Sequence, residues 1–333
     1  MSVSVAVLGA GSWGTALAIQ LARLGHSVRL WARDADQAQS MQTARVNKRY
    51  LPGITLADNI TVSADFDECV AGVDRVLVVT PSHAFAETVD RLAASLTPEI
   101  GLAWASKGFE PGSGRLLHEV AAERLGAEFP LALVTGPSFA REVAEGLPTA
   151  VTVAANMPDF GHRWAEMLHG ASFRAYYTAD LVGAELGGAI KNVLAVACGM
   201  ADGLGLGSNT RAALITRGLA EMMRLGQALG GDPRTLMGLA GIGDLVLTCT
   251  GDLSRNRRLG LALGQGRSRE EAEAEIGQVV EGIKTSEEVM RLAERSGVEM
   301  PISEQVHGIL FKGWSARKGV QVLMERDLKR ETE

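Results

Sequence analysis

The strongest constraint on the fold of this chain is a glycine-rich turn close to its N-terminus. Residues 3–8 form a short apolar segment that predicts a β-strand, and it runs directly into Gly9, Gly11 and Gly14, spaced G-x-G-x-x-G. Gly9 permits a tight turn, the missing side chain at Gly11 lets the backbone approach a pyrophosphate, and Gly14 lets the next helix lie close to the strand. The spacing predicts a dinucleotide-binding turn, with helix N–H groups facing the phosphates.

The segments after this turn fit the same unit. Residues 13–24 place apolar side chains on one helical face and stop at Gly25, which suits a left-handed C-cap, and residues 27–32 predict a second strand. A glycine turn alone is weak evidence, because such turns also occur for purely structural reasons. The strand before it, together with the helix and strand after it, favours dinucleotide binding.

The end of the second predicted strand bears on which dinucleotide is bound. NAD-specific sites usually place Asp or Glu there for the ribose 2′-hydroxyl, whereas this chain has Ala32, then Arg33 and only then Asp34. Arg33 is suited to stack on adenine and neutralise a 2′-phosphate, so we expect NADP(H) to be accepted or preferred. In the alternative interpretation, Arg33 is a solvated surface charge and Asp34 holds the ribose.

Composition excludes several classes of protein. The 333 residues allow two domains with separate cores, and the net charge of −6 argues against a nucleic-acid partner. The three cysteines, Cys69, Cys198 and Cys249, include no CxxC pair and predict buried free thiols in a reducing compartment. No apolar run reaches membrane-spanning length, and the six histidines show no metal-ligand spacing. We therefore expect a cytoplasmic protein without a membrane span or metal site.

Strand-like and helix-like segments alternate up to residue 178, which predicts a mostly parallel sheet covered by helices on both faces. The later strands are expected at residues 75–80, 101–106, 131–135, 150–154 and 172–178. Ligands bind beyond the carboxyl ends of such strands. Three loops qualify by position: residues 81–83, 107–108 and 136–140.

The pattern changes near residue 180. From there on, helical periodicity and glycine clusters replace strand-like segments. We expect residues 1–179 to form an α/β nucleotide-binding domain, residues 180–325 to form an all-helical domain, and residues 326–333 to form a charged, frayed tail.

Two residues of the helical part are candidates for proton transfer. Within residues 186–200, Lys191 and Asn192 are the strongly polar side chains of a small-residue helix that is expected to be buried. A buried lysine snorkels to solvent, pairs with a carboxylate or has its pKa lowered, and the last two outcomes suit an acid/base at a carbonyl. Asp244, which follows a glycine turn and has Thr248 one turn later, is a natural partner. The alternatives are a structural lysine and an N-cap aspartate.

A dense basic cluster follows at residues 254–258, with the sequence SRNRR. Ser254 is a plausible N-cap, which would place Arg255 and Asn256 in a helical first turn. Backbone N–H groups, the helix dipole and a guanidinium converge on one phosphate in such a turn. The alternative is a solvated basic face paired with glutamates.

With these motifs identified, the chain resembles bacterial NAD(P)-dependent glycerol-3-phosphate dehydrogenases. The match runs in order through GAGSWGTALA, PSH, SKG, GPSFA, GGAIKNVLA, TRGLAEM, GIGDLVLTCT, SRNRR and GQVVEG, which span nearly the whole chain. The resemblance implies reversible reduction of dihydroxyacetone phosphate to sn-glycerol 3-phosphate with NADP(H) or NAD(H), which feeds glycerophospholipid synthesis. It implies a Rossmann-like domain joined to an all-α domain like the C-terminal domain of 6-phosphogluconate dehydrogenase, with the active site between them, and a homodimer.

The resemblance also implies roles for individual residues. Cofactor contacts would come from Gly9, Gly11, Ser12, Trp13, Gly14, Arg33, Tyr50, Lys107, Ala140, Arg255, Val279 and Glu281. Substrate contacts would come from Lys107, Gly136, Ser138, Lys191, Asn192, Asp244, Thr248, Ser254, Arg255 and Asn256. Lys191 would be the catalytic acid/base, oriented by Asp244, with Lys107 adding positive field near the oxyanion.

Two other functions fit parts of the sequence. β-Hydroxyacid dehydrogenases share the nucleotide turn and a lysine in the helical domain, but the basic cluster after Ser254 and the turn before Asp244 argue against them. A non-catalytic nucleotide sensor would keep the α/β fold without needing Lys107, Lys191 and Asp244 together. Both alternatives predict no reduction of a phosphorylated ketone.

Overall fold

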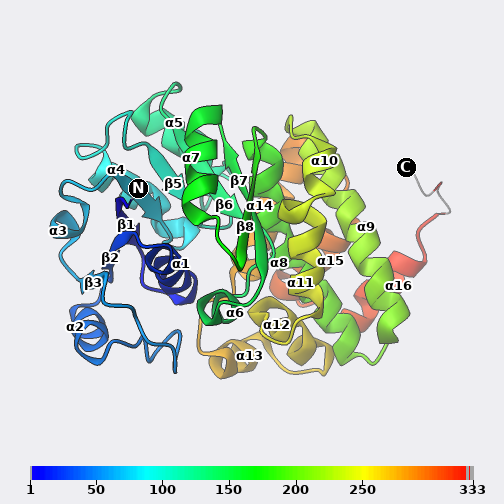
Figure 1. Cartoon of the computed structure of the whole chain (residues 1–333). Helices are drawn as coiled ribbons and strands as arrows, with labels where there is room; N and C mark the ends of the chain where they lie inside the picture. Colours follow the sequence, from blue (N-terminus) through cyan, green and yellow to red (C-terminus); the bar gives the residue numbers. More distant parts are fainter. Residues whose placement is uncertain (1, 328–329, 331–333) are drawn as a thin grey trace.

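The computed structural model describes residues 2–327 and 330, and it places a sheet half beside a helical half (Figure 1). The sheet has eight strands among the described residues, in the spatial order β3-β2-β1-β4-β5-β6-β7-β8. Their bounds are β1 Ser4–Leu8, β2 Ser27–Trp31, β3 Ile60–Ser63, β4 Arg75–Val78, β5 Leu102–Trp104, β6 Leu131–Thr135, β7 Thr149–Ala155 and β8 Phe173–Thr178. Each strand expected from the sequence is present, and β3 is additional.

The prediction of a mostly parallel sheet is confirmed. Neighbouring strands are parallel at every step except between β6 and β7, where Ala132 lies opposite Ala155 in an antiparallel register. Strand β1 lies between β2 and β4, and its Val5 pairs with Arg75 of β4. The chain first adds strands on the β2 side of β1 and then continues on the β4 side, so the direction of strand addition reverses at β1. Such a reversal is where doubly wound sheets bind nucleotides, so the glycine turn after β1 lies at the expected place.

Helices cover both faces of the sheet. They are α1 Ser12–Arg23, α2 Ala35–Ala44, α3 Phe66–Val70, the short 3-10 turn η1 Ser82–Ala84, α4 Phe85–Leu92, α5 Leu117–Leu125, α6 Ala140–Glu145 and α7 Pro158–Leu168. One buried cluster joins Leu17 of α1 and Trp164 of α7 to one face, and a second joins Phe85 of α4 and Val120 of α5 to the other. Burial on both faces explains why β1 and β4 to β6 read as continuous apolar runs.

The helical half follows β8, and no further strand occurs in the described residues after it. Its elements are α8 Leu181–Gly203, α9 Gly207–Ala228, α10 Pro233–Leu236, the π-turn η2 Leu239–Gly243, α11 Asp244–Thr250, α12 Arg255–Gly264, α13 Arg269–Ile276, α14 Glu281–Ser296, α15 Pro301–Phe311 and α16 Ala316–Met324. The expected all-helical C-terminal region is therefore confirmed.

Helix α8 starts in the sheet half and continues through the helical half. Leu181 and Ala184 belong to the same buried cluster as Leu133 of β6, while the residues from Leu186 onward lie in the helical core. Glu185 of α8 accepts a hydrogen bond of 3.0 Å from the backbone N–H of His118, at the start of α5. Only residues 179–180 separate β8 from α8, so one rigid helix joins the two halves.

Small residues let α8 and α12 pack backbone to backbone. A Cβ added to Gly260 would lie 2.0 Å from the carbonyl oxygen of Val196, and one on Gly199 would lie 2.1 Å from that of Arg257. Any larger residue at either position would therefore force the helices apart. This close packing brings the first turn of α12 next to the middle of α8.

The expectation that no apolar run reaches membrane-spanning length is wrong for α8. By length and composition this helix could cross a membrane, and the bent stretch Pro233–Thr250 with Arg255–Gly264 passes the same test only when counted as one span. Glu185 and Lys191 interrupt the apolar run in the sequence, but the helix as a whole remains strongly apolar. However, 94% of the most apolar window of α8 is buried inside the molecule, so the helix is part of the protein core.

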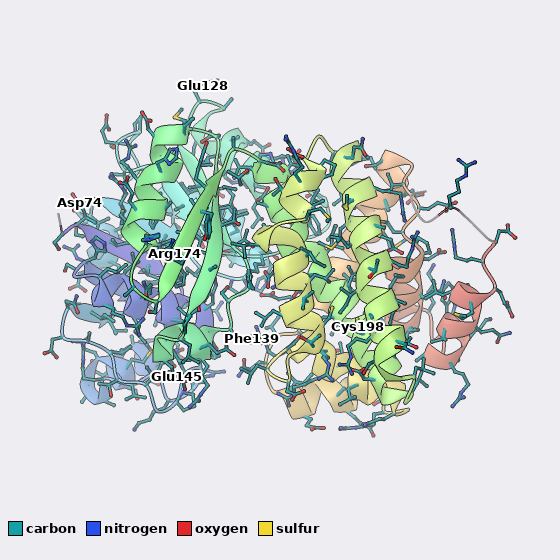
Figure 2. All side chains as sticks on the ribbon, turned by 45° about the vertical axis from the view of Figure 1, so that its right-hand side comes forward. Asp74, Glu128, Phe139, Glu145, Arg174 and Cys198 are labelled. Atoms are coloured by element: carbon teal, nitrogen blue, oxygen red, sulfur yellow. The ribbon has the colours of Figure 1, made fainter. Side chains whose placement is uncertain are left out.

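The cysteine prediction and the tail prediction fare differently. Cys69, Cys198 and Cys249 are free and buried, as expected, and Figure 2 places Cys198 within the helical half. Of the predicted frayed tail, residues 328–329 and 331–333 lie outside the described residues.

Candidate functional site

The turn after β1 has the geometry that a bound pyrophosphate requires. Gly9 has φ +125°, and a Cβ on it would lie 2.7 Å from the carbonyl oxygen of Val79. A Cβ on Gly14 would lie 1.9 Å from the carbonyl oxygen of Gly9, whereas one on Gly11 would meet nothing within 4 Å. Gly11 is the N-cap of α1, and no side chain caps the helix. The turn therefore presents open space and free helix N–H groups, which fit an anionic pyrophosphate.

A loop after α2 braces this turn from the side. The Asn47 amide donates to the carbonyl oxygen of Ala10 at 3.0 Å and to the Thr15 hydroxyl at 2.8 Å. Ser12 donates its hydroxyl to the carbonyl oxygen of Tyr50 at 2.8 Å, so two predicted cofactor residues meet there. Asn47 was not predicted, because it is one polar residue in a polar stretch and its partners lie more than 30 residues away.

The indole N–H of Trp13 is buried and has no hydrogen-bond partner among the described residues. Trp13 lies in the first turn of α1 and is one of the predicted cofactor contacts. An unpaired buried donor beside the glycine turn is consistent with a polar group arriving with a ligand.

Arg33 and Asp34, the two candidates for contact with the adenosine end of the cofactor, have different surroundings after β2. Asp34 is the N-cap of α2, and its carboxylate accepts a hydrogen bond of 2.9 Å from the backbone N–H of Gln37. Arg33 is exposed to solvent. One oxygen of Asp34 is thus engaged in capping, while its neighbour Arg33 is exposed and able to meet an anion.

Two lysines from different halves converge on one buried carboxylate. Lys191 of α8 places its Nζ 2.5 Å from Asp244 Oδ1, and Lys107, in the loop after β5, places its Nζ 2.8 Å from Asp244 Oδ2. Lys107 Nζ also lies 3.4 Å from the carbonyl oxygen of Gly136, after β6. Lys191 and Asp244 are 6% and 1% exposed. The cluster carries two positive charges against one negative charge at the carboxyl end of the sheet.

The local electrostatics follow from this burial. Burial lowers the pKa of Lys191 to about 8, with the charge of Asp244 opposing the shift and that of Lys107 adding to it. Burial alone would raise the pKa of Asp244, but the charges of Lys107 and Lys191 hold that pKa below its usual range. Asp244 is therefore ionised, and Lys191 releases its proton more readily than a free lysine.

Asp244 faces the lysines because of the π-turn before it. A Cβ on Gly187 of α8 would lie 2.2 Å from the carbonyl oxygen of Ala240, so the turn packs directly on the helix. The N-cap of α11 is Gly243, and the Asp244 side chain accepts from the lysines. The N-cap interpretation of Asp244 is thus wrong. Thr248 donates to the carbonyl oxygen of Asp244 at 2.6 Å, within the same helix.

Next to this cluster, side-chain amides link three helices. Asn256 of α12 donates to Asn192 Oδ1 at 2.8 Å and accepts from the backbone N–H of Gly282 at 2.9 Å. Asn192 in turn donates to Glu281 Oε2 at 3.3 Å. These hydrogen bonds hold the first turns of α12 and α14 against α8 at Asn192, one residue beyond Lys191.

The basic cluster divides into two parts. Ser254 caps α12 as expected, accepting from the backbone N–H of Arg257 at 3.2 Å. The Arg257 guanidinium pairs with Asp202 and Asp252, each at 2.7 Å. Arg255 instead makes a weak contact of 3.4 Å with the amide oxygen of Gln278 and no ion pair with a described residue. Arg257 is therefore paired with carboxylates, but these are aspartates and its side chain is 13% exposed, so the alternative of a solvated basic face paired with glutamates is wrong for this residue. Arg255 keeps its capacity to bind an anion.

The remaining predicted site residues make fewer contacts with the lysine cluster and the basic cluster. Ser138 donates to the carbonyl oxygen of Gly136 at 2.9 Å, and Ala140 opens α6. Between them Phe139 lies at the boundary of the two halves, where a Cβ on Gly251 would be 2.6 Å from its ring (Figure 2). Val279 is 55% exposed just before α14.

His83 is a candidate that residue-level reasoning did not single out. It lies in the loop after β4, where burial and the charges of Lys284 and Arg33 lower its pKa while Glu281 opposes the shift. These neighbours come from both halves and include two predicted cofactor contacts. The available signal was its position in a loop beyond a strand end.

Comparisons with known proteins match this architecture. Residues 4–161 match the NAD-dependent glycerol-3-phosphate dehydrogenase N-terminus, and residues 180–321 match the C-terminus of the same family. The chain belongs to the NAD-dependent glycerol-3-phosphate dehydrogenase family. Both parts of the family are present in order, so each half of the site lies in a region that the family shares.

Relatives and solved structures of this family are similar over nearly their full length. Proteins named glycerol-3-phosphate dehydrogenase (NAD(P)+) from Stenotrophomonas maltophilia and Xanthomonas campestris are 59% and 58% identical, over 98% of this chain and 96% of theirs. The crystal structure of glycerol-3-phosphate dehydrogenase from Coxiella burnetii has a TM-score of 0.94 and 49% identity, covering 98% of this chain and 99% of that one. D-mandelate dehydrogenase, at 12% identity and a TM-score of 0.65, shares the fold alone.

Proposed function

We propose that this chain catalyses the reversible NAD(P)H-dependent reduction of dihydroxyacetone phosphate to sn-glycerol 3-phosphate, and so supplies the backbone of glycerophospholipids. The observation that carries the proposal is the surplus positive charge at Asp244, where Lys107 and Lys191 share one carboxylate at 2.8 and 2.5 Å. A buried site with one unmatched cation is suited to stabilise an oxyanion that forms during reaction.

The sheet half would hold the cofactor. Gly9, Gly11 and Gly14 with the first turn of α1 would bind the pyrophosphate, and Arg33 would lie at the adenosine end. Ser12, Trp13, Tyr50 and Ala140 would line this site, with Arg255, Val279 and Glu281 completing it from the helical half. When bound, the nicotinamide supplies a hydride to the ketone carbon of the substrate.

Lys191 would act as the general acid. Its ammonium would hydrogen-bond the substrate carbonyl and give a proton to the oxygen as it becomes an alkoxide. Asp244 would hold that ammonium in place, and Lys107 would add a second positive charge beside the oxyanion. In the reverse direction the neutral amine of Lys191 would accept the proton. The lowered pKa of Lys191 favours this neutral amine over the ammonium.

The first turn of α12 would hold the substrate phosphate. Ser254 and Asn256 belong to this turn and would contact the phosphate, and the weakly engaged guanidinium of Arg255 would provide a bidentate partner. Gly136, Ser138, Asn192 and Thr248 would position the three-carbon chain between phosphate and lysines. Binding the phosphate at one end would orient the carbonyl at the other.

We also propose the organisation that goes with this activity. Residues 1–179 would form the nucleotide-binding domain, residues 180–325 the substrate domain and residues 326–333 a charged tail. The protein would act in the cytoplasm as a homodimer. Three buried free thiols support a reducing compartment, and light scattering of the purified protein tests the dimer.

The decisive experiment follows NADH and NADPH oxidation at matched concentrations of dihydroxyacetone phosphate, with a β-hydroxyacid pair assayed beside it. We expect turnover with dihydroxyacetone phosphate and none with the β-hydroxyacid pair. Turnover with the β-hydroxyacid pair alone, or no oxidation of either cofactor, would overturn the proposal.

A further inference from the structure

The loop between β5 and α5 belongs to the sheet half by sequence but packs into the helical half. Lys107 stands near its start, and it continues to Leu116, directly before α5. Phe109 and Leu116 are 2% and 4% exposed, and both belong to the buried cluster of the helical half. This loop is therefore anchored at both ends in the core of the other half.

Helix α14 holds the middle of this loop through its backbone. Glu288 Oε1 accepts a hydrogen bond of 2.8 Å from the N–H of Gly112, and Arg291 donates to the carbonyl oxygen of Gly112 at 2.7 Å. Arg295 donates to the carbonyl oxygen of Ser113 at 3.3 Å. Three side chains on one face of α14 thus form hydrogen bonds with the backbone of two consecutive loop residues.

The loop is also braced by its own hydrogen bonds, so a displacement at Gly112 would also move its stem, the segment around Lys107. Glu110 binds the Arg115 guanidinium at 2.7 Å and the Ser113 hydroxyl at 2.6 Å through one carboxylate oxygen. Backbone hydrogen bonds run from Glu110 N to Arg115 O at 3.0 Å and from Gly114 N to Glu110 O at 3.1 Å. A loop closed on itself in this way moves as a unit.

Lys107 lies at the stem of this braced loop. A Cβ on its neighbour Gly108 would lie 3.0 Å from the Ser82 hydroxyl and 4.0 Å from Thr285 of α14. Thr285 and Glu288 are one helical turn apart, so α14 contacts the stem and the middle of the loop with one face. Glu281, a proposed cofactor contact, opens the same helix.

We infer that Glu288 is a positioning residue for the reaction, because it fixes the loop that sets the Lys107 ammonium against Asp244. Glu288 is 6% exposed, and its second oxygen accepts no hydrogen bond from the described residues and lies 3.8 Å from Arg291 Nε. A buried carboxylate is retained at some expense in stability, so its single strong hydrogen bond to Gly112 is its evident role. This inference rests on the proposed function, in which Lys107 supports the oxyanion.

The inference predicts a change in proton affinity as well as in rate. The charged or titratable groups facing Lys191 are Asp244 from α11, Lys107 from the loop and Cys249 from α11. Of these, Lys107 lowers the pKa of Lys191 through like charge. Releasing the loop would let Lys107 move away, so the Lys191 ammonium would persist to higher pH. A loss of stability alone would leave that pH unchanged.

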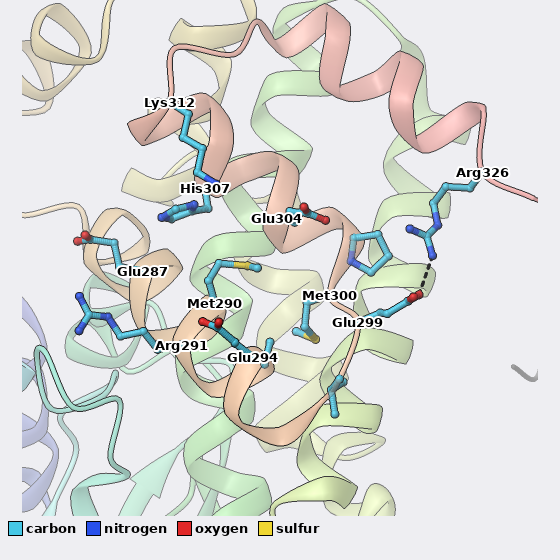
Figure 3. A pocket seen from close by; sticks show the side chains of 13 residues that line it. Glu287, Met290, Arg291, Glu294, Glu299, Met300, Glu304, His307, Lys312 and Arg326 are labelled. Carbon is cyan, nitrogen blue, oxygen red and sulfur yellow. Dashed lines mark hydrogen bonds and ion pairs between the residues drawn. The ribbon is translucent and has the colours of Figure 1, made fainter.

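The test compares Glu288→Ala with Glu288→Gln and Glu287→Ala. The glutamine variant keeps an oxygen acceptor for Gly112. Glu287 is adjacent in sequence but lines a groove of about 570 Å³ on the outer face of α14 and α15, together with Glu294 and His307 (Figure 3). No residue of the lysine cluster lines that groove, so Glu287→Ala is a matched surface control.

We expect Glu288→Ala to lower kcat on the order of tenfold with little change in KM for NAD(P)H, and to move the alkaline limb of the kcat profile to higher pH. Hydrogen exchange at the Gly112 amide should accelerate in this variant. Glu288→Gln should restore most of kcat and the original pH profile, and Glu287→Ala should match the unsubstituted protein in both.

Arg291→Ala provides a second route if Glu288→Ala does not fold, because Arg291 is exposed and also holds Gly112. It should reduce kcat and shift the alkaline limb in the same direction. Faster exchange at Gly112 with an unchanged kcat and pH profile would overturn the positioning role. Absence of dihydroxyacetone phosphate reduction by the unsubstituted protein would instead overturn the proposed function beneath it.

Discussion

Two buried carboxylates of the helical half, Asp244 and Glu221, are equally hidden from solvent but have opposite surroundings. Asp244 meets two ammonium groups. Glu221 of α9 accepts hydrogen bonds from neutral donors at the start of α15: the N–H of Ile302 at 2.6 Å, the N–H of Ser303 at 3.3 Å and the Ser303 hydroxyl at 3.1 Å. The charge of Arg224 also acts on it, but without an ion pair among the contacts of the described residues. One carboxylate is part of a cluster with positive charge left over, and the other caps a helix.

The two carboxylates respond to burial in opposite directions. Burial raises the pKa of Glu221 to about 7, which its hydrogen bonds only partly offset, whereas two lysine charges keep the pKa of Asp244 low despite burial. The comparison teaches that a buried acid alone does not mark a reactive site. The charge that remains after every partner is counted does, because it is available to an incoming anion.

The largest effect is expected for Lys191→Ala, which removes the surplus positive charge at Asp244. We expect kcat to fall by about 10²- to 10⁴-fold, because the proton donor is lost while the glycine turn and the first turn of α12 remain. Circular dichroism and thermal melting check that the fold is intact. Glu221→Gln is the matched control and should retain kcat. Normal turnover in Lys191→Ala would remove Lys191 from its role.

The pH profile sharpens the same point. In the proposed mechanism, reduction needs Lys191 as an ammonium, so kcat for reduction should fall as pH rises through about 8, and kcat for oxidation should rise over the same range. Steady-state assays in both directions between pH 6 and about 10 measure this. A profile that is flat in both directions across this range contradicts the assignment.

Glu221→Gln tests the other carboxylate through stability. The folded-state pKa of Glu221, about 7, lies above its ordinary value of 4.5, so the folded state holds its proton more tightly than the unfolded state. The resulting stabilisation is complete below pH 4.5 and is lost as pH rises through 7, by about 3 kcal/mol in the free energy of unfolding. Denaturant titrations at several pH values should show this slope in the parent and not in Glu221→Gln. Equal slopes in both proteins would mean that Glu221 is not the group responsible.

The arginines of α12 give a third contrast between an available and a satisfied charge. Arg255→Ala should raise KM for dihydroxyacetone phosphate by about 10- to 100-fold, since one charge-assisted bond to phosphate is lost. Arg257→Ala should chiefly lower stability, because it leaves Asp202 and Asp252 without that guanidinium. The two variants are compared by steady-state kinetics and thermal melting. A larger KM effect in Arg257→Ala would reverse this assignment.

The smallest effect is expected at the edge of the cofactor site. Arg33→Ala should lower kcat/KM for NADPH by about fivefold to tenfold and leave the value for NADH nearly unchanged, because an exposed cation contributes little beyond its 2′-phosphate contact. Assays with the two cofactors at matched substrate measure the ratio. Strong preference of the unsubstituted protein for NADH would refute the role of Arg33.

Sequence predicts this molecule best where function depends on neighbours along the chain. Gly9, Gly11 and Gly14 act within one turn, so their spacing, with the strand before it and the helix and strand after it, predicts the nucleotide turn. Ser254 caps its own helix, and its role follows from the residues just after it. These interactions span a few residues, and backbone geometry fixes them.

The contacts that sequence does not predict join distant residues. Lys107 and Asp244 are 137 positions apart, and they meet only because the loop after β5 enters the helical half. Asp244 itself fits an N-cap pattern, and the π-turn packed on Gly187 turns it toward the lysines instead. Likewise nothing near Arg257 indicates that Asp202, 55 positions away, neutralises it. Tertiary packing decides these partners, and no local propensity encodes them.

Because α8 is one uninterrupted helix, it restricts relative motion of the sheet half and the helical half. Its first turns are built into the sheet core with Leu133, and Lys191 lies less than three turns beyond Ala184 on the same uninterrupted helix. Bending between these points would break helical hydrogen bonds. Lys191, the proposed proton donor, is therefore held by the same helix that packs into the sheet core, and any opening that admits substrate must come from elements other than α8.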